Sequence, residues 1–249
     1  MNYPLCALLV ECNRDVDYTT VAQNGCEVDY KFLELDDTLV ICFEPSDSKI
    51  DWKINFSYWR KPYKDMGISY RVHGGFLKSF KLVRDDIRAK VLEPQENGFR
   101  WKNVVVVGYS HGGALSALCH ELVWFERPDL REEGLVGLNF EGPRVFAGFR
   151  IPEALKERWA HFYTFRNHAD LVTHMPPVLF GFRHVGEMKK IKDNVGVGLV
   201  HAHYQKRILI SLKKFEEAEG IEIPNAVENG LRCGLTDILL EIDRAGDKK

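Results

Sequence analysis

The sequence lacks the markers of several specialised protein classes. Its six cysteines include no Cys-x-x-Cys pair and its nine histidines no His-Glu-x-x-His, so we expect no metal site and no cofactor. The 36 acidic residues nearly cancel the 34 basic ones, which argues against a nucleic-acid partner. The apolar run near the N-terminus ends at Glu11 without a basic leader, and no later run reaches the roughly 18 apolar residues of a transmembrane segment. These absences favour a cytoplasmic protein.

The most informative stretch that is present runs from Val104 to Leu115. Four consecutive valines predict a strand buried on both faces, and a helical pattern starts directly after Gly108-Tyr109-Ser110-His111-Gly112. This Gly-x-Ser-x-Gly spacing between a strand and a helix is typical of a nucleophile elbow, where a sharp turn exposes the serine. Side chains two residues before or after the serine would collide with the strand or the helix. The alternative, a glycine–serine turn that only caps a helix, is disfavoured by the flanking elements.

Predicted strands and helices alternate along most of the chain. Strands are expected at 37–43, 104–107, 135–140 and 161–165, and helices at 76–91, 112–125, 152–159 and from about 201 to 215. Residues 1–35 are weakly patterned, 181–197 look like a hairpin, and the tail after about residue 220 is a candidate for a loosely attached appendage. The alternation predicts a single α/β domain over residues 1–249, with a mostly parallel central sheet and helices on both faces.

A nucleophilic serine needs a base to take its proton and an acid to orient that base. In α/β-hydrolases these follow in the order serine, acid, histidine, at the carboxyl ends of successive strands. Asp170 comes directly after the strand at 161–165, and Asp193 is the alternative acid. His201 and His203 both stand at the entrance of the next helix, so position alone does not choose between them.

Several separated blocks resemble the class 3 lipase family, the fungal-lipase-like branch of the α/β-hydrolases. They occur in the family's order: Val72-His73-Gly74-Gly75-Phe76, Gly108 to Leu115, Asn139 to Val145, Asn167 to Val172 with Pro176-Pro177, and Phe182 to Gly186. The resemblance implies an α/β-hydrolase fold and a carboxylic ester hydrolase of the triacylglycerol lipase type.

The same resemblance assigns roles to individual residues. Ser110 corresponds to the nucleophile and Asp170 to the acid, while the backbone of Ser46 and that of His111 correspond to the oxyanion hole. The family's His-x-x-Tyr spacing, completed here by Tyr204, favours His201 over His203 as the base. His73 and His184 belong to family-like blocks, and we expect them to hold loops by hydrogen bonds.

The chain also departs from the family pattern near the site. Glu44-Pro45 stands where the family has Arg-Gly, Glu141 replaces a glycine, and the stretch after Ser46 is rich in Asp and Lys instead of forming an apolar lid. The candidates for substrate contact are therefore two residues of the aromatic stretch at 56–70, and the tyrosine beside the nucleophile: Trp59, Tyr63 and Tyr109.

These patterns predict a serine ester hydrolase acting on acylglycerol-type or other lipid or small esters, with transient contact to a lipid surface. A phospholipase or thioesterase with the same triad is one alternative. A non-catalytic α/β-hydrolase module that binds a ligand or partner is the other.

Overall fold

A mostly parallel sheet forms the centre of the molecule. The computed structural model describes residues 3–14, 17–44, 59–191, 205–218, 220–236 and 238. Within these residues seven strands pair in the order β1-β2-β3-β8-β9-β11-β13. The strands from β3 to β13 run parallel, and β2 and β1 extend the sheet by antiparallel pairing. The bounds are β1 Thr19–Gln23, β2 Cys26–Leu35, β3 Thr38–Phe43, β8 Asn103–Tyr109, β9 Leu135–Phe140, β11 Phe162–Asn167 and β13 Glu187–Ile191. This architecture confirms the predicted fold class.

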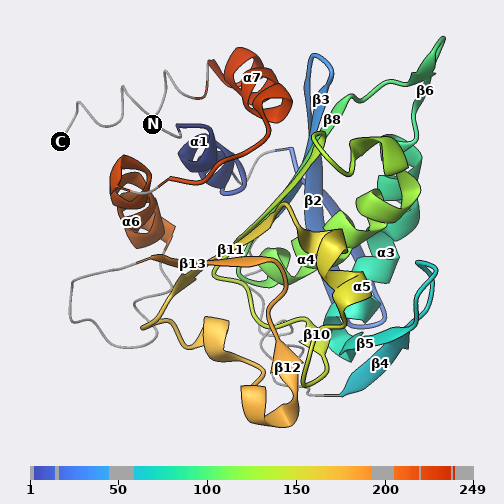
Figure 1. Cartoon of the computed structure of the whole chain (residues 1–249), viewed down its shortest axis with the longest axis vertical. Coiled ribbons are helices and arrows are strands. Elements are labelled where there is room, and N and C mark those ends of the chain that lie inside the picture. The colour runs from blue at the N-terminus through green and yellow to red at the C-terminus, as the bar shows by residue number, and fades with distance from the viewer. Residues whose placement is uncertain are drawn as a thin grey trace.

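Helices cover both faces of this sheet (Figure 1). One face carries α1 Tyr3–Glu11, α6 Gln205–Ala218 and α7 Asn225–Gly234, and the other carries α3 Gly74–Val91, α4 His111–Glu126 and α5 Glu153–Lys156. Short 3-10 turns follow several elements: η1 Pro128–Leu130, η2 Glu157–Trp159, η3 Val172–His174 and η4 Val178–Phe180. None of the described helices is long and apolar enough to cross a lipid bilayer.

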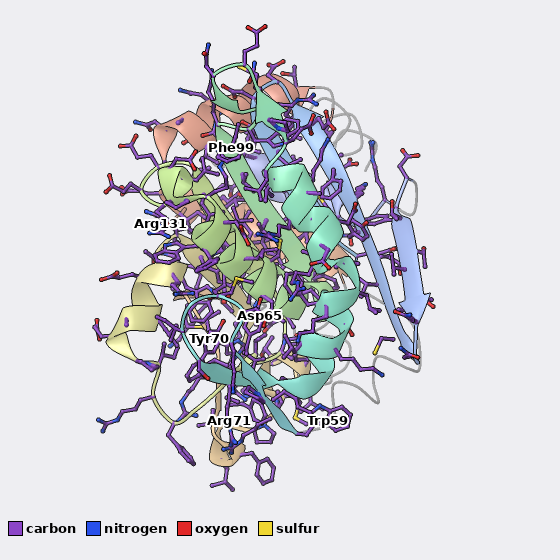
Figure 2. The ribbon with its side chains drawn as sticks, turned by 90° about the vertical axis from the view of Figure 1, so that its right-hand side faces the viewer. Trp59, Asp65, Tyr70, Arg71, Phe99 and Arg131 are labelled. Atoms are coloured by element: carbon purple, nitrogen blue, oxygen red, sulfur yellow. The ribbon has the colours of Figure 1, made fainter. Side chains whose placement is uncertain are left out.

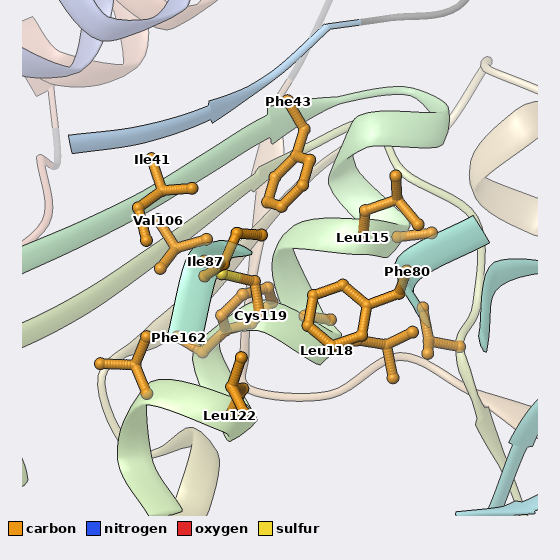
Figure 3. Close-up of a cluster of buried hydrophobic side chains, with 14 of the residues drawn as sticks. Ile41, Phe43, Phe80, Ile87, Val106, Leu115, Leu118, Cys119, Leu122 and Phe162 are labelled. Carbon is orange, nitrogen blue, oxygen red and sulfur yellow. The ribbon is translucent and has the colours of Figure 1, made fainter. Parts of the chain in front are cut away.

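The valine run of β8 contributes to the cores on both faces. Val104 and Val106 pack into the cluster beneath α3 and α4, together with Phe80 and Leu118 (Figure 3). Their neighbours along the strand, Val105 and Val107, pack into the cluster beneath α1, α6 and α7. Side chains alternate between the faces of a strand, so a run that is apolar at every position is required when both faces are covered.

A smaller sheet extends from the carboxyl end of the large one. Its four strands, in the order β12-β10-β5-β4, are β12 Phe182–Arg183, β10 Phe146–Ala147, β5 Tyr70–His73 and β4 Arg60–Tyr63. A separate hairpin pairs β6 Pro94–Gln95 with β7 Gly98–Phe99. Because β10 follows β9 within a few residues and β5 leads directly into α3, this sheet is tied to the loops that surround the ends of β9 and β8.

Two regions in the second half of the chain differ from what the sequence suggests. In the region 181–197 the structure describes residues up to 191, and there β12 and β13 do not pair with each other, because β13 pairs in parallel with β11 while β12 pairs with β10 in the other sheet. The described part of the tail is not an appendage, because Val227, Leu231 and Leu235 are fully buried in the core beneath α7. Both regions find their partners far away along the chain.

A buried contact between a guanidinium and a carboxyl group joins α4 to η2. The Nη1 of Arg158 donates to the Glu121 carboxylate, and both side chains are inaccessible to water. Tyr63 and Tyr70 pack edge-to-face beside the pair, with ring centroids 5.6 Å apart. Burial raises the pKa of Glu121 to about 7, although the charge of Arg158 acts in the opposite direction. Glu121 therefore keeps its proton in the folded chain at pH values where it is ionised in the unfolded chain.

We expect Glu121→Gln to remove a pH-dependent part of the stability. The folded chain holds the proton up to about pH 7 and the unfolded chain loses it near pH 4.3, so the contribution is complete below pH 4.3 and disappears as pH rises through 7. In the wild type, this contribution to the free energy of unfolding falls by on the order of 3 kcal/mol between pH 4.3 and pH values above 7. Urea unfolding should show that the free energy of unfolding decreases less between about pH 5 and about pH 8 in the variant than in the wild type.

Glu216 provides the comparison for this experiment, because burial also raises its pKa to about 7. Glu216→Gln should remove a separate part of the same decline, and the double variant should remove both. An unchanged pH dependence in Glu121→Gln would show that this carboxyl is ionised equally in the folded and unfolded chains.

Candidate active site

Ser110 stands at the turn between β8 and α4 in a strained backbone conformation. Its φ of 54° and ψ of −119° lie in a region that residues with a side chain rarely adopt. The turn is held on both sides, because the Ser110 N–H donates to the Phe140 carbonyl at 2.9 Å and its own carbonyl accepts from the Gly113 N–H at 3.0 Å. Strand, strained serine and helix together have the geometry of a nucleophile elbow.

The glycines around Ser110 are explained by direct contacts between backbone segments. A Cβ on Gly108 would lie 2.1 Å from the Gly112 carbonyl oxygen, and a Cβ on Gly112 would lie 2.5 Å from the Phe43 carbonyl oxygen. Both neighbours are backbone atoms that a side chain cannot push aside. The predicted collision with the strand and the helix therefore occurs at both positions.

Asn139 fixes the loop on the other side of the elbow, a role that the sequence does not reveal. Its Oδ1 accepts from the Gly142 N–H at 2.9 Å, and a Cβ on Gly113 would lie 2.2 Å from that oxygen. Between them Glu141 has a φ of 52°. The family pattern has a glycine at this position, and the glutamate in this chain adopts a left-handed conformation at a cost of roughly 1 kcal/mol.

Asp170 lies just beyond the end of β11, and its side chain is completely buried. One carboxylate oxygen accepts from the Val172 N–H at 2.9 Å, and the Asp170 N–H donates to the Asn167 carbonyl at 3.2 Å. The Thr173 hydroxyl donates to the Asp170 carbonyl at 2.9 Å. A buried carboxylate fixed in this way by a turn is suited to orient an imidazole.

The guanidinium of Arg166 contacts the turn that carries Asp170. Arg166 Nε donates to the Thr173 hydroxyl at 3.0 Å, and its Nη2 contacts the His174 ring at 2.8 Å. Burial lowers the pKa of Arg166, while the nearby charge of Asp170 raises it. The hydrogen bond from Arg166 to Thr173 thus holds the loop that carries the Asp170 carboxylate.

His111 is the first residue of α4, where backbone N–H groups point out of the helix. Its imidazole is buried and packs edge-to-face on Phe76, with ring centroids 5.4 Å apart. The part of His111 that is directed to the elbow is therefore its backbone, as an oxyanion-hole donor requires.

The remaining predicted site residues fall in stretches that the structure leaves undescribed. Ser46, His201, His203 and Asp193 all lie outside the described residues. Of the predicted triad, Ser110 and Asp170 are described, at the carboxyl ends of β8 and β11 with β9 between them.

The three predicted substrate contacts occupy different environments. Tyr109 and Tyr63 are buried, at 4% and 1% exposed, in the cores on opposite faces of the sheet. Their side chains are enclosed by other residues, and substrate contact by either one stays a prediction. Trp59 is half exposed at the lower end of the molecule and covers Gly74 (Figure 2). Aromatic composition alone could not separate the exposed ring from the packed ones.

His73 and His184 hold loops. His73 caps α3 by accepting from the Phe76 N–H at 3.3 Å, and His184 Nε2 contacts the Thr173 carbonyl at 2.8 Å. Burial lowers the pKa of His184 to about 3, so it is neutral at physiological pH. In the described part of the chain no group of three His, Cys, Asp or Glu side chains converges as a metal site would require.

Comparison with known protein families identifies the family of this chain. Residues 40–180, more than half of the chain, match the model of the family described as lipase (class 3). The chain belongs to the class 3 lipase family. The matched range contains the elbow, the Asn139 loop and the Asp170 turn, and it confirms the resemblance read from the separate sequence blocks.

Several fungal lipases are similar to this chain in sequence or structure. This class 3 lipase-family chain is 34% identical to the lipase of Rhizomucor miehei over 166 residues, which cover 63% of the chain and 42% of that relative. It is 28% identical over 148 residues to the secreted mono- and diacylglycerol lipase 1 of Fusarium solani, covering 59% and 41%. Lipase II from Rhizopus niveus superimposes with a TM-score of 0.60 at 26% identity, covering 70% of this chain and 66% of that one. The chain therefore spans about two fifths of the length of the curated relatives it matches.

Proposed function

We propose that this class 3 lipase-family chain is a serine hydrolase of lipid carboxylic esters, acting on acylglycerols or similar esters. The observation that carries the proposal is the backbone of Ser110, held at φ 54° on top of a fully buried strand. Such strain persists where the surrounding structure enforces it, and it is concentrated at functional sites. The relatives called lipases, one of them a mono- and diacylglycerol lipase, support the substrate class.

In the proposed reaction Ser110 attacks the acyl carbonyl while a histidine takes the hydroxyl proton. Asp170 orients that imidazole and stabilises its positive charge, and the imidazolium gives the proton to the departing alcohol as the ester C–O bond breaks, which leaves the acyl group on Ser110. The histidine then takes a proton from water, which attacks the acyl-enzyme, and returns it to Ser110 as the carboxylic acid is released. The backbone N–H groups of His111 and Ser46 would stabilise the developing oxyanion, each donor contributing roughly 3 kcal/mol in such sites.

Reaction with a fluorophosphonate probe tests this proposal directly. The probe is expected to form one covalent adduct, which peptide mass spectrometry should locate on Ser110. A folded chain that stays unlabelled would contradict the proposal and favour a non-catalytic ligand-binding module. A series of p-nitrophenyl esters of increasing acyl length, measured below and above micelle formation, would then define the substrate. A sharp rise on aggregated esters indicates a lipase, and its absence indicates an esterase.

The base is proposed to be His201, with His203 as the alternative, because His201 has the family's spacing to Tyr204. His201→Ala is expected to lower turnover of a soluble p-nitrophenyl ester far more than His203→Ala does. The reverse order would assign the base to His203, and full activity in both variants would contradict a triad that uses either histidine.

The chain is further proposed to act as a single domain in the cytoplasm. All six cysteines are free thiols and five of them are buried, which suits a reducing compartment. Attaching a fluorescent tag and locating it by microscopy with cell fractionation would test this.

A further inference from the structure

A basic and apolar surface lies at the end of the molecule formed by the smaller sheet. Three described segments build it: 59–64, 148–150 and 178–183. We call these segments the tip surface. None of their residues belongs to the proposed triad or oxyanion hole, and only Trp59 and Tyr63 were considered for substrate contact.

Hydrogen bonds join the three segments into one surface. The Nη2 of Arg60 donates to the Phe180 carbonyl, and the Gly148 N–H donates to the Gly181 carbonyl at 2.7 Å. Arg183 Nη1 donates to the Val178 carbonyl at 3.2 Å. The segments thus keep a fixed relation to one another although they are far apart in sequence.

Large apolar side chains are unusually exposed on the tip surface. It holds five of the nine exposed large apolar side chains of the described residues, which makes it a patch and not a random scatter: Leu179 83%, Phe149 65%, Trp59 51%, Phe180 48% and Val178 43%. The lower end of the molecule, where Trp59 and Arg71 are labelled, presents this surface to solvent (Figure 2). Patches of this kind mark sites of association.

The charges of the tip surface are all positive. Its segments contain Arg60, Lys61, Lys64, Arg150 and Arg183 but no Asp or Glu, in a chain whose net charge is −2. Asp65, which follows directly, forms an ion pair with Arg84 at 2.8 Å. Exposed apolar side chains bordered by cations complement a surface of apolar chains bordered by anionic headgroups.

We propose that the tip surface docks the chain on anionic lipid surfaces. Phe149, Val178, Leu179 and Phe180 enter the interface, and the arginines and lysines contact the phosphate groups. The loops that follow β9 and β11 connect the tip surface to the site, since the Arg144 N–H donates to the Met175 carbonyl at 2.7 Å between them. Docking therefore holds the loop that Asn139 fixes and the loop that carries Asp170 close to the lipid surface. The role of docking in catalysis rests on the proposed function, but the docking itself does not, because vesicle binding can be measured without turnover.

Vesicle flotation with the full chain carrying Ser110→Ala tests the docking independently of catalysis. Binding should be tighter to vesicles of phosphatidylcholine mixed with phosphatidylglycerol than to phosphatidylcholine alone, and it should weaken as salt screens the charges. In this background Leu179→Ser is expected to weaken binding to the mixed vesicles about tenfold, through lost apolar burial. Arg150→Gln is expected to weaken it about fivefold, as one cation near an anionic surface contributes.

Matched controls come from α6, on the opposite face of the large sheet. Ile210→Ser removes another exposed apolar side chain, and Lys214→Gln removes another exposed cation. Both should bind vesicles like the parent. With Ser110 intact, Leu179→Ser and Arg150→Gln should hydrolyse a soluble p-nitrophenyl ester at the parental rate, so a failed docking surface is distinguished from a failed enzyme.

Equal binding to neutral and anionic vesicles would overturn the proposal, as would unchanged binding by both tip variants. Absence of vesicle binding combined with self-association that Leu179→Ser abolishes would also overturn it, and would identify a second copy of the chain as the occupant. Sedimentation velocity of the parent and the variant measures this outcome.

Discussion

Ser110→Ala is expected to lower kcat/KM for a soluble p-nitrophenyl ester by at least about 10⁴-fold and to abolish labelling by a fluorophosphonate. The loss follows from the removal of the attacking oxygen, because the remaining site can only bind and polarise the ester. The substitution deletes one atom of a half-buried side chain, so circular dichroism and the melting temperature should stay close to the wild type. Retained turnover in a correctly folded variant would place the nucleophile elsewhere.

Ser110→Gly provides the matched variant for this experiment. Glycine adopts φ 54° and ψ −119° without the steric cost that a Cβ imposes, whereas alanine keeps that cost. The glycine variant should be equally inactive but more stable than the alanine variant by about 1 kcal/mol in urea unfolding. If alanine were the more stable of the two, the backbone at the elbow would not be strained.

Asp170→Asn is expected to lower kcat by about 10⁴-fold with little change in KM. The amide oxygen can still accept from the Val172 N–H, so the turn is retained while the negative charge is lost. An uncharged side chain does not stabilise the imidazolium and favours the wrong tautomer of the base. Steady-state kinetics across pH would measure the split between kcat and KM.

Thr173→Val separates loss of the charge from loosening of the turn. It removes the hydroxyl that donates to the Asp170 carbonyl but leaves the carboxylate in place. We expect a loss of stability of about 1–3 kcal/mol and a much smaller loss of kcat than in Asp170→Asn. A kcat that stays within tenfold of the wild type in Asp170→Asn would assign the acid to another residue, with Asp193 as the alternative.

The elements that sequence alone predicts are those whose patterns are local. The run from Val104 to Val107 predicts a strand buried on both faces, because every side chain in it is apolar. The helical spacing of apolar residues in 76–91 predicts α3. The elbow is recognised from an equally local pattern, the Gly-x-Ser-x-Gly spacing between a strand and a helix, although the backbone that excludes a side chain at Gly112 is that of Phe43 on β3. Asp170 was found by chain order and by its place after a strand.

The features that sequence could not predict depend on partners far along the chain. The strand at 187–191 pairs in parallel with β11, whereas β12 just before it pairs with β10 in the other sheet. Glu121 and Arg158 pair across 37 positions, so neither residue shows locally that it is buried. Tyr63 and Tyr109 were predicted to contact substrate from their neighbourhood in sequence, and the structure places both rings within the core.

The position of α7 has a consequence for how the chain becomes active during synthesis. Val227 and Leu231 belong to the core that covers Val105 and Val107 on the strand behind the nucleophile. Until α7 has left the ribosome, that side of the elbow strand lacks part of its cover, although Ser110 was translated more than a hundred residues earlier. Nascent chains carry transiently exposed apolar surface of this kind, and chaperones bind it. Competence to react at Ser110 is therefore expected to arise only after α7 has emerged and packed, and not when the elbow itself emerges.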